Sequence, residues 1–576
     1  MGLQHLAAAT YKVCSRCLPK ILSGSFQAKD GRWPARTARA ASSSLLAILA
    51  SGITALRRKI LRMTLRHGVV AFVLFALSAF AQHSEPATRP ADASSSSDAA
   101  KPGEPIKNPL PGDKSVPQTI TVNGKTLHYT ATVGTIALKS KDEKPTAVVM
   151  YTAFTLDAGK GDAKGEGKEG GTHRPVTFAL NGGPGASSVF LNLGAIGPKR
   201  VGFGNVGDSL SDPAMLTDNP GTWLDFTDLV FIDPIGTGFS RSLVDEQETK
   251  KLFYAPTPDI EYLSLVIYKW LVQNDRLLDK KYLVGESYGG YRGPRMTRYL
   301  QSRLGVAMNG LVLASPYLNP ERGDPNLSPI PWMISLPSIA AAHLESEGKL
   351  TDSAMQQVIA YTRGDYSQAL LKGRTDPAAT DAMIAHVTDM TGLDPTFVKF
   401  SGGRLDIGAY LREVHRTERL IGSVYDSNVT APDPFPYAPT QQAGDPILES
   451  IVAPTTTAMV DFITRTVGWK TDARYEALSY EVNAQWDRNA DLRKGAATDL
   501  RESVAADPKL RVLILHGWND LSCPFMGSVL TVDQMPIMGD ASRVQVHEFP
   551  GGHMFYTRPV NQVPLHKLAE TMVETH

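Results

Sequence analysis

Residues 281–290 of the chain read KYLVGESYGG, and this stretch decides the fold. A short apolar run leads into Gly285-Glu286-Ser287-Tyr288-Gly289, which matches the pattern G-x-S-x-G. Where this pattern joins a strand to a helix, the serine stands on a sharp turn, and small residues on either side make room for it. The stretch therefore predicts a strand, a tight turn that exposes the hydroxyl of Ser287, and a helix.

Four more apolar segments are similar to the strand before Ser287. Strands that are covered by helices on both faces read as continuous apolar runs of this kind. Residues 259–278 carry apolar residues at helical spacing and lead directly into the Ser287 strand, which completes a β-α-β unit. The sequence thus predicts an α/β fold of the α/β-hydrolase type, with a mostly parallel central sheet and helices on both faces. The four segments are VTFALNG (176–182), DLVFIDP (228–234), NGLVLASP (309–316) and RVLILHG (511–517).

The alternation of predicted strands and helices divides the chain of 576 residues into one α/β core and an insertion. Residues 116–320 hold the first part of the core, which begins with a hairpin around Asn123-Gly124. Residues 506–576 hold the last part. Residues 321–505 break the alternation and read as mostly helical, so we expect them to form a cap insertion over the site.

Residues 63–81 are expected to be a secretory signal peptide. Basic residues precede an apolar run that is too short for a good membrane span, and Ala79-Phe80-Ala81 supplies a cleavage signal before Gln82. A buried helix or a membrane anchor is the alternative. The sequence therefore predicts a secreted or periplasmic protein whose mature chain has no stable membrane span.

Two further segments near the amino end lie outside the expected core. Residues 1–62 are basic and poor in acids, which fits either an over-long gene start, with Met63 as the initiator, or a transit peptide. Residues 82–115 are rich in Pro, Ser and Ala and bury too little apolar surface to fold, so they predict a disordered linker.

Composition argues against nucleic acid and metals as partners. The formal net charge is +1, so no global field favours nucleic acid or an anionic membrane. Cys14-x-x-Cys17 is half of a metal or redox motif and has no second half. The sequence holds neither a zinc-protease motif nor a nucleotide-binding loop, so we expect no metal and no cofactor.

A serine hydroxyl is a poor nucleophile until a base takes its proton, and this fold supplies the partners in the order serine, acid, histidine. Asp520 comes just past a buried strand, and His553 lies in a glycine-rich loop near the carboxyl end. We expect His553 to take the proton from Ser287 and to return it to the leaving group. Asp520 would orient His553 and stabilise its cation. Three alternatives are less well placed relative to the strand ends: His516, His547 and Asp540.

A second signal, Asn181-Gly182-Gly183-Pro184-Gly185, closes another apolar strand. Consecutive glycines let backbone amides approach a ligand closely. An oxyanion hole needs two such donors at the place where negative charge develops. The predicted donors are the N–H groups of Gly183 and Tyr288, and a tight turn without chemistry is the alternative.

Taken together, these motifs resemble the serine carboxypeptidase family. Five segments match its patterns in the right order between about residues 176 and 560. The resemblance implies a catalytic triad of Ser287, Asp520 and His553, with oxyanion donors at Gly183 and Tyr288. The five segments are NGGPGASS, DLVFIDPIGTGFS, GESYGGYRGP, HGWNDLSCPFMG and PGGHMFY.

The resemblance also implies that Asn181 and Glu286 bind the free carboxylate of the substrate's last residue. Gly182 and Met554, from the same motifs, are then further substrate-binding residues. A carboxypeptidase must recognise a terminal carboxylate in order to reject internal bonds. Because two like charges repel unless they share a proton, such enzymes are expected to favour acidic pH.

The chain departs from the family pattern at several positions. Ala179 and Ala186 stand where members often carry a tryptophan and a cysteine. Ala195 precedes Ile-Gly-Pro where many members carry a second glutamate, so the usual pair of carboxyl groups is incomplete. Cys523 matches the family's D-x-x-C and is expected to place a thiol near the site.

The sequence as a whole predicts a serine-type carboxypeptidase that acts on peptides through an acyl-enzyme on Ser287. The runner-up is an esterase, an aminopeptidase-like hydrolase or an acyltransferase of the same fold, because triad and oxyanion hole serve any acyl-enzyme. The carboxylate-binding group discriminates between them: Asn181 and Glu286 favour peptides, and Ala195 argues against them. A non-catalytic binding protein on a hydrolase fold is the third alternative.

Overall fold

A computed structural model describes residues 110–122, 124–157, 174–202, 210–318, 328–488 and 495–575. All of these residues belong to one structural unit, Asp92–His576. Several sequence-based expectations lie outside the described residues: Cys14 and Cys17, the segments 1–62 and 63–81, Asn123 at the hairpin tip, and most of the linker 82–115.

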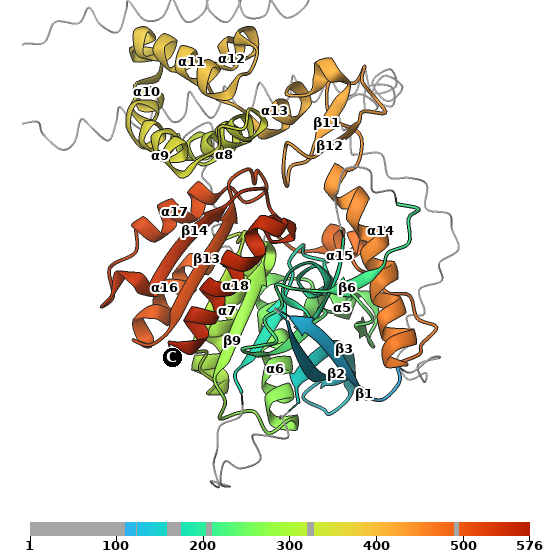
Figure 1. The fold of residues 1–576 in the computed structure, drawn as a ribbon. Coiled ribbons are helices and arrows are strands. Elements are labelled where there is room, and N and C mark those ends of the chain that lie inside the picture. The colour runs from blue at the N-terminus through green and yellow to red at the C-terminus, as the bar shows by residue number, and fades with distance from the viewer. Residues whose placement is uncertain are drawn as a thin grey trace, which may run out of the picture. The chain divides into compact units, whose positions relative to one another are not determined.

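A ten-stranded sheet forms the centre of this unit, in the order β1-β2-β3-β7-β4-β9-β10-β13-β14, with β8 paired to β3 (Figure 1). Neighbouring strands from β7 to β14 are parallel, whereas β1, β2 and β3 are antiparallel. The strands are β1 (Lys114–Val122), β2 (Lys125–Lys139), β3 (Pro145–Leu156), β4 (Val176–Leu180), β7 (Asp228–Ile232), β8 (Arg241–Ser242), β9 (Lys281–Glu286), β10 (Gly310–Ala314), β13 (Arg511–Gly517) and β14 (Val544–Phe549).

All five apolar segments that predicted strands form them, and a sixth strand of the parallel part, β14, was not predicted. The hairpin is also present, since Val122 pairs with Lys125 across a two-residue turn. Strand β1 begins at Lys114, slightly before the expected core boundary at residue 116. Two small hairpins stand apart from the main sheet: β5 (Lys199–Val201) with β6 (Leu216–Asp218), and β11 (Leu420–Gly422) with β12 (Thr430–Pro432).

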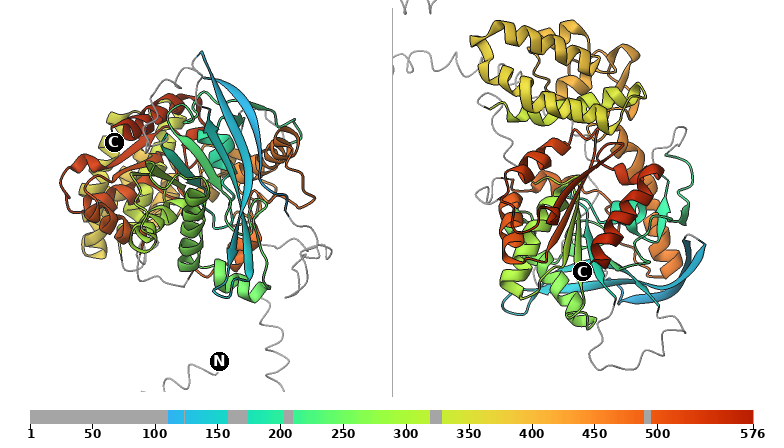
Figure 2. Two further views of the ribbon diagram at one scale, coloured as in Figure 1. Left: turned by 90° about the horizontal axis from the view of Figure 1, so that it is seen from below. Right: turned by 60° about the vertical axis from the view of Figure 1, so that its left-hand side comes forward.

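Both faces of the central strands are buried, because successive side chains point to opposite sides and helices cover each side. In β7, Val230 and Ile232 belong to one core cluster and Phe231 to the other. Figures 1 and 2 show helices on both sides of the sheet. The first cluster packs against α6 (Pro256–Gln273), α7 (Tyr288–Tyr299) and α16 (Ala496–Ala506), and the second against α14 (Pro446–Asp461) and α18 (Pro559–Glu574). The predicted α/β-hydrolase fold is thereby confirmed.

Helix α6 ends before the expected limit at Leu278. Its last turn is closed by Asn274, whose side-chain amide donates to Trp270 O (2.8 Å). Asp275 then adopts φ +57°, a left-handed conformation that does not continue the helix. The remaining core helices are α4 (Val189–Leu191), α5 (Glu246–Phe253), α15 (Tyr480–Gln485), α17 (Phe525–Asp533) and, as π-helical turns, residues Asn192–Ile196, Leu300–Leu304 and Phe462–Val467.

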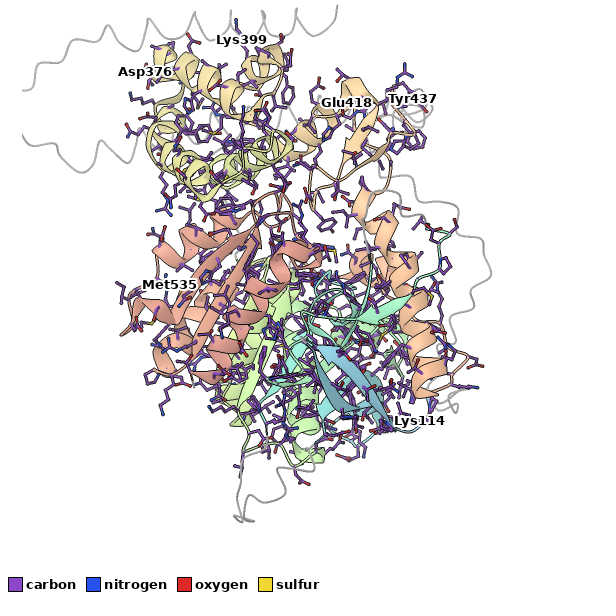
Figure 3. The ribbon with its side chains drawn as sticks, in the orientation of Figure 1. Lys114, Asp376, Lys399, Glu418, Tyr437 and Met535 are labelled. Carbon is purple, nitrogen blue, oxygen red and sulfur yellow. The ribbon has the colours of Figure 1, made fainter. Side chains whose placement is uncertain are left out.

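The first part of the insertion between β10 and β13 has a core of its own, which includes Met333, Tyr366 and Val387. A second cluster joins it to the sheet, because Ala340 and Met355 pack with Trp518 and Phe525. Asp376 caps one of its helices by accepting from Ala379 N (3.0 Å), and Figure 3 labels it together with Lys399. The helices are α8 (Ile330–Ser346), α9 (Asp352–Tyr361), α10 (Ser367–Lys372), α11 (Pro377–Thr391), α12 (Pro395–Ser401) and α13 (Ile407–Glu413).

The expected cap, 321–505, is too broad. The apolar residues of α14 and α16 fill the two clusters that cover the sheet, so these helices belong to the α/β core. One described helix, Pro446–Val467, has 22 residues and is long and apolar enough by composition to cross a membrane. Here its Ile451, Ala458 and Phe462 pack in the core. Its carboxyl end is tied to the start of β1, where Lys114 Nζ donates to Gly468 O (2.9 Å) (Figure 3).

A buried ion pair joins α6 to α7 directly behind the Ser287 turn. Arg292 and Asp259 are 1% and 0% exposed, and Arg292 Nε donates to Asp259 Oδ2 (2.7 Å). Arg292 Nη1 also donates to Asn181 O (2.8 Å), which ties the loop after β4 to the same helix. Burial raises the pKa of Asp259 despite the opposing charge of Arg292. The pair is therefore costly to break, because one buried charge would lose its partner.

We expect Arg292→Met to lower the free energy of unfolding by about 3–5 kcal/mol, the cost of leaving a buried charge unpaired. Urea unfolding of the purified protein measures this change. The control is Arg465→Met, which removes an exposed pair with Asp461 and should leave the unfolding midpoint nearly unchanged. Equal midpoints for the two variants would contradict the account.

Candidate active site

Ser287 stands on a strained turn between β9 and α7, as the sequence predicts. Its backbone has φ +59° and ψ −121°, which a non-glycine residue rarely adopts. A Cβ at Gly285 would lie 2.1 Å from Gly289 O, and one at Gly289 would lie 2.4 Å from Leu180 O. No larger residue fits at either position, so the two glycines allow the turn and the turn presents Ser287.

The loop after β4 lies against the same turn. A Cβ at Gly182 would lie 2.4 Å from Tyr288 N, so the two backbones are in close contact. Gly183 is exposed, and Tyr288 begins α7, where helix amides have no partner within the helix. Within the described part of the chain, neither amide donates to a protein acceptor. Both N–H groups are thus available to bind a developing negative charge.

One backbone segment and one buried carboxylate hold this loop in place. The segment 475–483 follows α14 and makes two hydrogen bonds to this loop. Ala477 O accepts from Ser187 N (3.0 Å), and Ser479 N donates to Gly185 O (2.7 Å). Behind it, Asp233 accepts from Ser188 N (2.8 Å) and from Tyr475 OH (3.2 Å).

Burial raises the pKa of Asp233 to about 7, although the bonds from Ser188 N and Tyr475 OH lower it.

The segment 475–483 could not be recognised from sequence, because its partners are backbone atoms far away in the chain.

Asp520 and His553 meet at the carboxyl ends of β13 and β14. These neighbouring parallel strands place the two following loops side by side, and Asn519 N donates to Gly551 O (2.8 Å). His553 Nδ1 is 2.7 Å from Asp520 Oδ2, and both residues are buried. Asp520 Oδ1 accepts from the amides of Ser522 and Cys523 (2.8 and 2.9 Å). The carboxylate therefore holds the proton on Nδ1 and leaves Nε2 of His553 free to accept one.

Glu286, next to the serine, lies beside the same histidine. Glu286 Oε1 is 3.7 Å from His553 Nε2 and accepts from Tyr556 OH (3.2 Å). Glu286 Oε2 accepts from Asn181 Nδ2 (2.7 Å). Two neutral donors thus fix the carboxyl group next to the imidazole, and Tyr556 was not identified from sequence.

The pKa of His553 is raised above its ordinary value. Burial alone would lower it, but the charge and hydrogen bond of Asp520 outweigh burial, and the charge of Glu286 adds to them. Because a histidine acts as a base only when neutral, activity should fall as pH drops through this raised pKa.

A cavity of about 280 Å³ opens onto these groups. Ser287, His553, Glu286 and Gly183 all line it, and so does Met554. The other lining residues carry no charge and come from the loop after β4, from α4, from the chain between β10 and β13, and from the loop after β13: Ala186, Phe190, Tyr425, Leu448, Ile451, Leu478, Ser479, Tyr480, Asn483 and Ser522. No hydrogen bond joins Ser287 to His553 within the described residues; in enzymes without substrate this bond is often long and tightens on binding.

Two expected substrate-binding residues lie behind the cavity rather than in its wall. Asn181 is fully buried, and its side chain bridges Glu286 and Leu191 N (2.9 Å). Gly182 is buried against α7. Both therefore support the wall, since the short turn after β4 folds their atoms inward. Ala195 is also buried and does not line the cavity, and its carbonyl accepts from Asn219 Nδ2 (2.8 Å).

The alternative triad residues His516, His547 and Asp540 do not line the cavity at Ser287. His516 is buried inside β13 with Nε2 2.8 Å from Ser528 Oγ, and burial lowers its pKa to about 4. His547 contacts Gln545 in β14, and Asp540 caps an exposed turn. Cys523 is buried and lines a second cavity of about 380 Å³, next to the loop that carries Asp520.

One group of described residues brings metal-ligating atoms together. The ligand atoms of Asp225, His566 and Glu570 lie within 4.8 Å of one another. His566 Nε2 is already bonded to both Asp225 oxygens (3.0 and 2.9 Å), and Glu570 pairs with Lys567 (2.9 Å). None of these residues lines the cavity at Ser287.

Comparison with known proteins gives a family model described as serine carboxypeptidase, which matches residues 165–553. The chain is similar to the pheromone-processing carboxypeptidase KEX1 of Ogataea parapolymorpha, with 32% identity over 162 residues, or 27% of this chain and 24% of that protein. It is also similar to serine carboxypeptidase-like 36 of Arabidopsis thaliana, with 26% identity over 223 residues, or 38% of this chain and 40% of that protein. The chain thus matches less than half the length of these curated relatives.

Among solved structures, the chain is similar to Kex1(Δ)p, a prohormone-processing carboxypeptidase from Saccharomyces cerevisiae. The match has a TM-score of 0.48 and 15% identity, and it covers 77% of this chain and 91% of that one.

From the contact between Glu286 and His553 we predict how the pH dependence of activity changes in a Glu286 variant. In Glu286→Gln one of the charges that raise the pKa of His553 is lost, so the acid limb of kcat/KM should move to lower pH. A simple ester without a free carboxylate is the substrate, because Glu286 then affects only the histidine.

The control variant is Glu502→Gln, which removes a half-exposed pair with Arg298 and should not move the acid limb. An acid limb that stays in place in Glu286→Gln would show that the Glu286 charge does not reach the imidazole.

Proposed function

The chain belongs to the serine carboxypeptidase family, and on this premise we propose that it removes the last residue of peptides through an acyl-enzyme on Ser287. The observation that carries the proposal is one cavity wall that joins Ser287, His553 and a carboxyl group, Glu286. The first two residues serve any acyl transfer, whereas a buried carboxyl group beside the nucleophile suits the recognition of a terminal carboxylate.

The first half of the reaction forms the acyl-enzyme. Ser287 Oγ attacks the carbonyl carbon of the last peptide bond while its proton moves to His553 Nε2. Asp520 stabilises the resulting imidazolium, and the N–H groups of Gly183 and Tyr288 receive the oxyanion. His553 then gives the proton to the leaving amine as the C–N bond breaks.

In the second half, water repeats the same steps on the ester. His553 takes a proton from the water, the hydroxyl adds to the carbonyl carbon, and Ser287 Oγ regains the proton as it leaves. The shortened peptide is released with a new carboxylate.

Recognition of the terminal carboxylate rests on Glu286. Two like charges repel unless a proton lies between them, so the substrate carboxylate binds when Glu286 carries a proton. Asn181 and Tyr556 hold the carboxyl group in position, which supports a recognition role for it although Ala195 replaces the family's second glutamate. Peptide cleavage therefore combines two opposite demands: a neutral His553 and a protonated Glu286.

The lining of the cavity suggests which peptides fit. Most lining side chains are apolar or aromatic, and Glu286 and His553, both already engaged, are its charged groups. An apolar last residue such as leucine is therefore the appropriate probe.

We further propose that the mature enzyme acts outside the cytoplasm, in the periplasm or as a secreted protein. The signal-like segment 63–81 supports this location. Mass spectrometry of the protein exported by its host should find Gln82 at the mature amino end. A protein that stays in the cytoplasm would contradict the proposal, and an exported chain that retains residues 63–81 would favour a membrane anchor over a cleaved signal peptide.

The central test of the activity compares a blocked dipeptide ending in leucine with its carboxyl-amidated twin across pH 4–8. We expect cleavage of the free acid only, with its best pH below that of ester hydrolysis, and loss of both activities in Ser287→Ala. Chromatography of released leucine and leucinamide measures the two rates.

Equal cleavage of both dipeptides, or cleavage of esters alone, would favour the alternative of a general esterase or acyltransferase. Glu286 would then be a structural acid.

A further inference from the structure

A short segment of the insertion, residues 423–428, touches both catalytic loops through its backbone. Val424 O accepts from Leu521 N (3.1 Å), next to Asp520, and Tyr425 O accepts from His553 N itself (2.6 Å). A Cβ at Gly552 would lie 1.9 Å from Tyr425 O, so the histidine loop packs directly on this segment. The position of the imidazole is thus set in part by a segment that comes from outside the sheet.

The ring of Tyr425 lies beside His553. The two ring centroids are 5.1 Å apart, with the planes inclined by 57°. Tyr425 also lines the cavity with Ser287 and His553. A shift of this segment would therefore change both the hydrogen bond from His553 N to Tyr425 O and the wall of the cavity that Tyr425 forms.

Arg558, five residues after His553 in the chain, connects the segment to the catalytic loops by charge. Its Nη2 donates to Asp426 Oδ2 (2.7 Å) and to Glu345 Oε2 (3.3 Å), and its Nη1 donates to Glu345 Oε1. Glu345 lies at the end of α8 and Asp426 in the segment 423–428, so one guanidinium bridges two parts of the insertion. Arginine suits this task because its planar fork binds two carboxylates at once.

Asn519, the residue before Asp520, completes the network. Its Nδ2 donates to Glu345 Oε2 and approaches Asp426 Oδ1 (3.4 Å). Asn428 Nδ2 donates to the same Glu345 oxygen (3.0 Å). Asn519, which precedes the proposed acid, and Arg558, which lies five residues after the proposed base, therefore contact the same two carboxylates.

The charges in this network are partly removed from water, since the side chains of Asp426, Glu345 and Arg558 are 5%, 22% and 31% exposed. Burial lowers the pKa of Arg558, but the hydrogen bond to Glu345 and the charges of Asp426 and Glu345 outweigh burial and raise it. Burial raises the pKa of Asp426, and the charge of Glu345 adds to this effect. One cation shared by two acids in such surroundings is strongly coupled to both, so its loss frees the segment and the loops together.

We propose that Arg558 is a positioning residue for His553: through Glu345 and Asp426 it locks the segment 423–428 onto the catalytic loops and keeps the imidazole in reach of Ser287. The proposal rests on the proposed acyl-enzyme chemistry of Ser287. It assigns to the insertion a role in the geometry of the triad, in addition to shaping the cavity.

The test compares Arg558→Gln with Arg412→Gln. Arg412 is an arginine of the insertion whose side chain is more deeply buried than that of Arg558 (5% against 31% exposed), and it pairs with Asp433 and donates to Ala438 O (3.0 Å) without touching either catalytic loop. For Arg558→Gln we expect kcat on a simple ester to fall by about ten- to a hundredfold with little change in KM, because small misplacements of a catalytic group cost up to about 10² in rate. For Arg412→Gln we expect kcat near that of the wild type. Circular dichroism at the assay temperature checks that both variants are folded.

If Arg558→Gln lowers the melting temperature and leaves kcat unchanged, Arg558 is a structural residue only and the proposal is overturned. Equal losses of kcat in both variants would overturn it as well. Should Arg558→Gln not fold, Glu345→Gln gives the same test with an isosteric side chain, and an unchanged kcat in that variant contradicts the proposal. Ester turnover by the wild type separates these outcomes from a failure of the proposed acyl-enzyme chemistry at Ser287, which would abolish the reference activity itself.

Discussion

The arrangement of the site depends on a backbone contact at which no side chain fits. Gly285 and Gly289 enclose Ser287, and Gly289 packs on the carbonyl of Leu180 at the end of β4. This contact accompanies the positive φ of Ser287 and brings the start of α7 against the glycine loop that follows β4. The proposed nucleophile and both proposed oxyanion donors are therefore positioned together by a single packing constraint.

The parallel sheet brings the remaining groups to that point. Strands β4, β9, β10, β13 and β14 all run in one direction, so the loops that follow them lie along the same edge of the sheet. Glu286, Asp520 and His553 come from three of these loops or strand ends. The insertion leaves the sheet at the same edge, which explains how Tyr425 and the segment 475–483 reach the catalytic loops without distorting the core.

The sequence predicted those features of the fold that residues close together in the chain determine. The apolar runs located the strands, and the G-x-S-x-G pattern located the sharp turn that carries Ser287. Strand β14 was missed because its residues at this edge of the sheet are only partly buried and its apolar pattern is weak. The roles of Tyr556 and Arg558 could not be predicted, because they depend on contacts such as that of Arg558 with Glu345, 213 positions apart. The sequence did not indicate that the side chain of Asn181, which we expected to bind substrate, is buried and donates to Glu286.

The most direct test of the central claim is covalent labelling with a fluorophosphonate, followed by mass spectrometry of the digested protein. Such a reagent reacts with a serine that a neighbouring base has activated. The account predicts one adduct on the peptide that contains Ser287, its absence in Ser287→Ala, and slow labelling in Asp520→Asn. An adduct on another residue, or no adduct on folded wild-type protein, would contradict it.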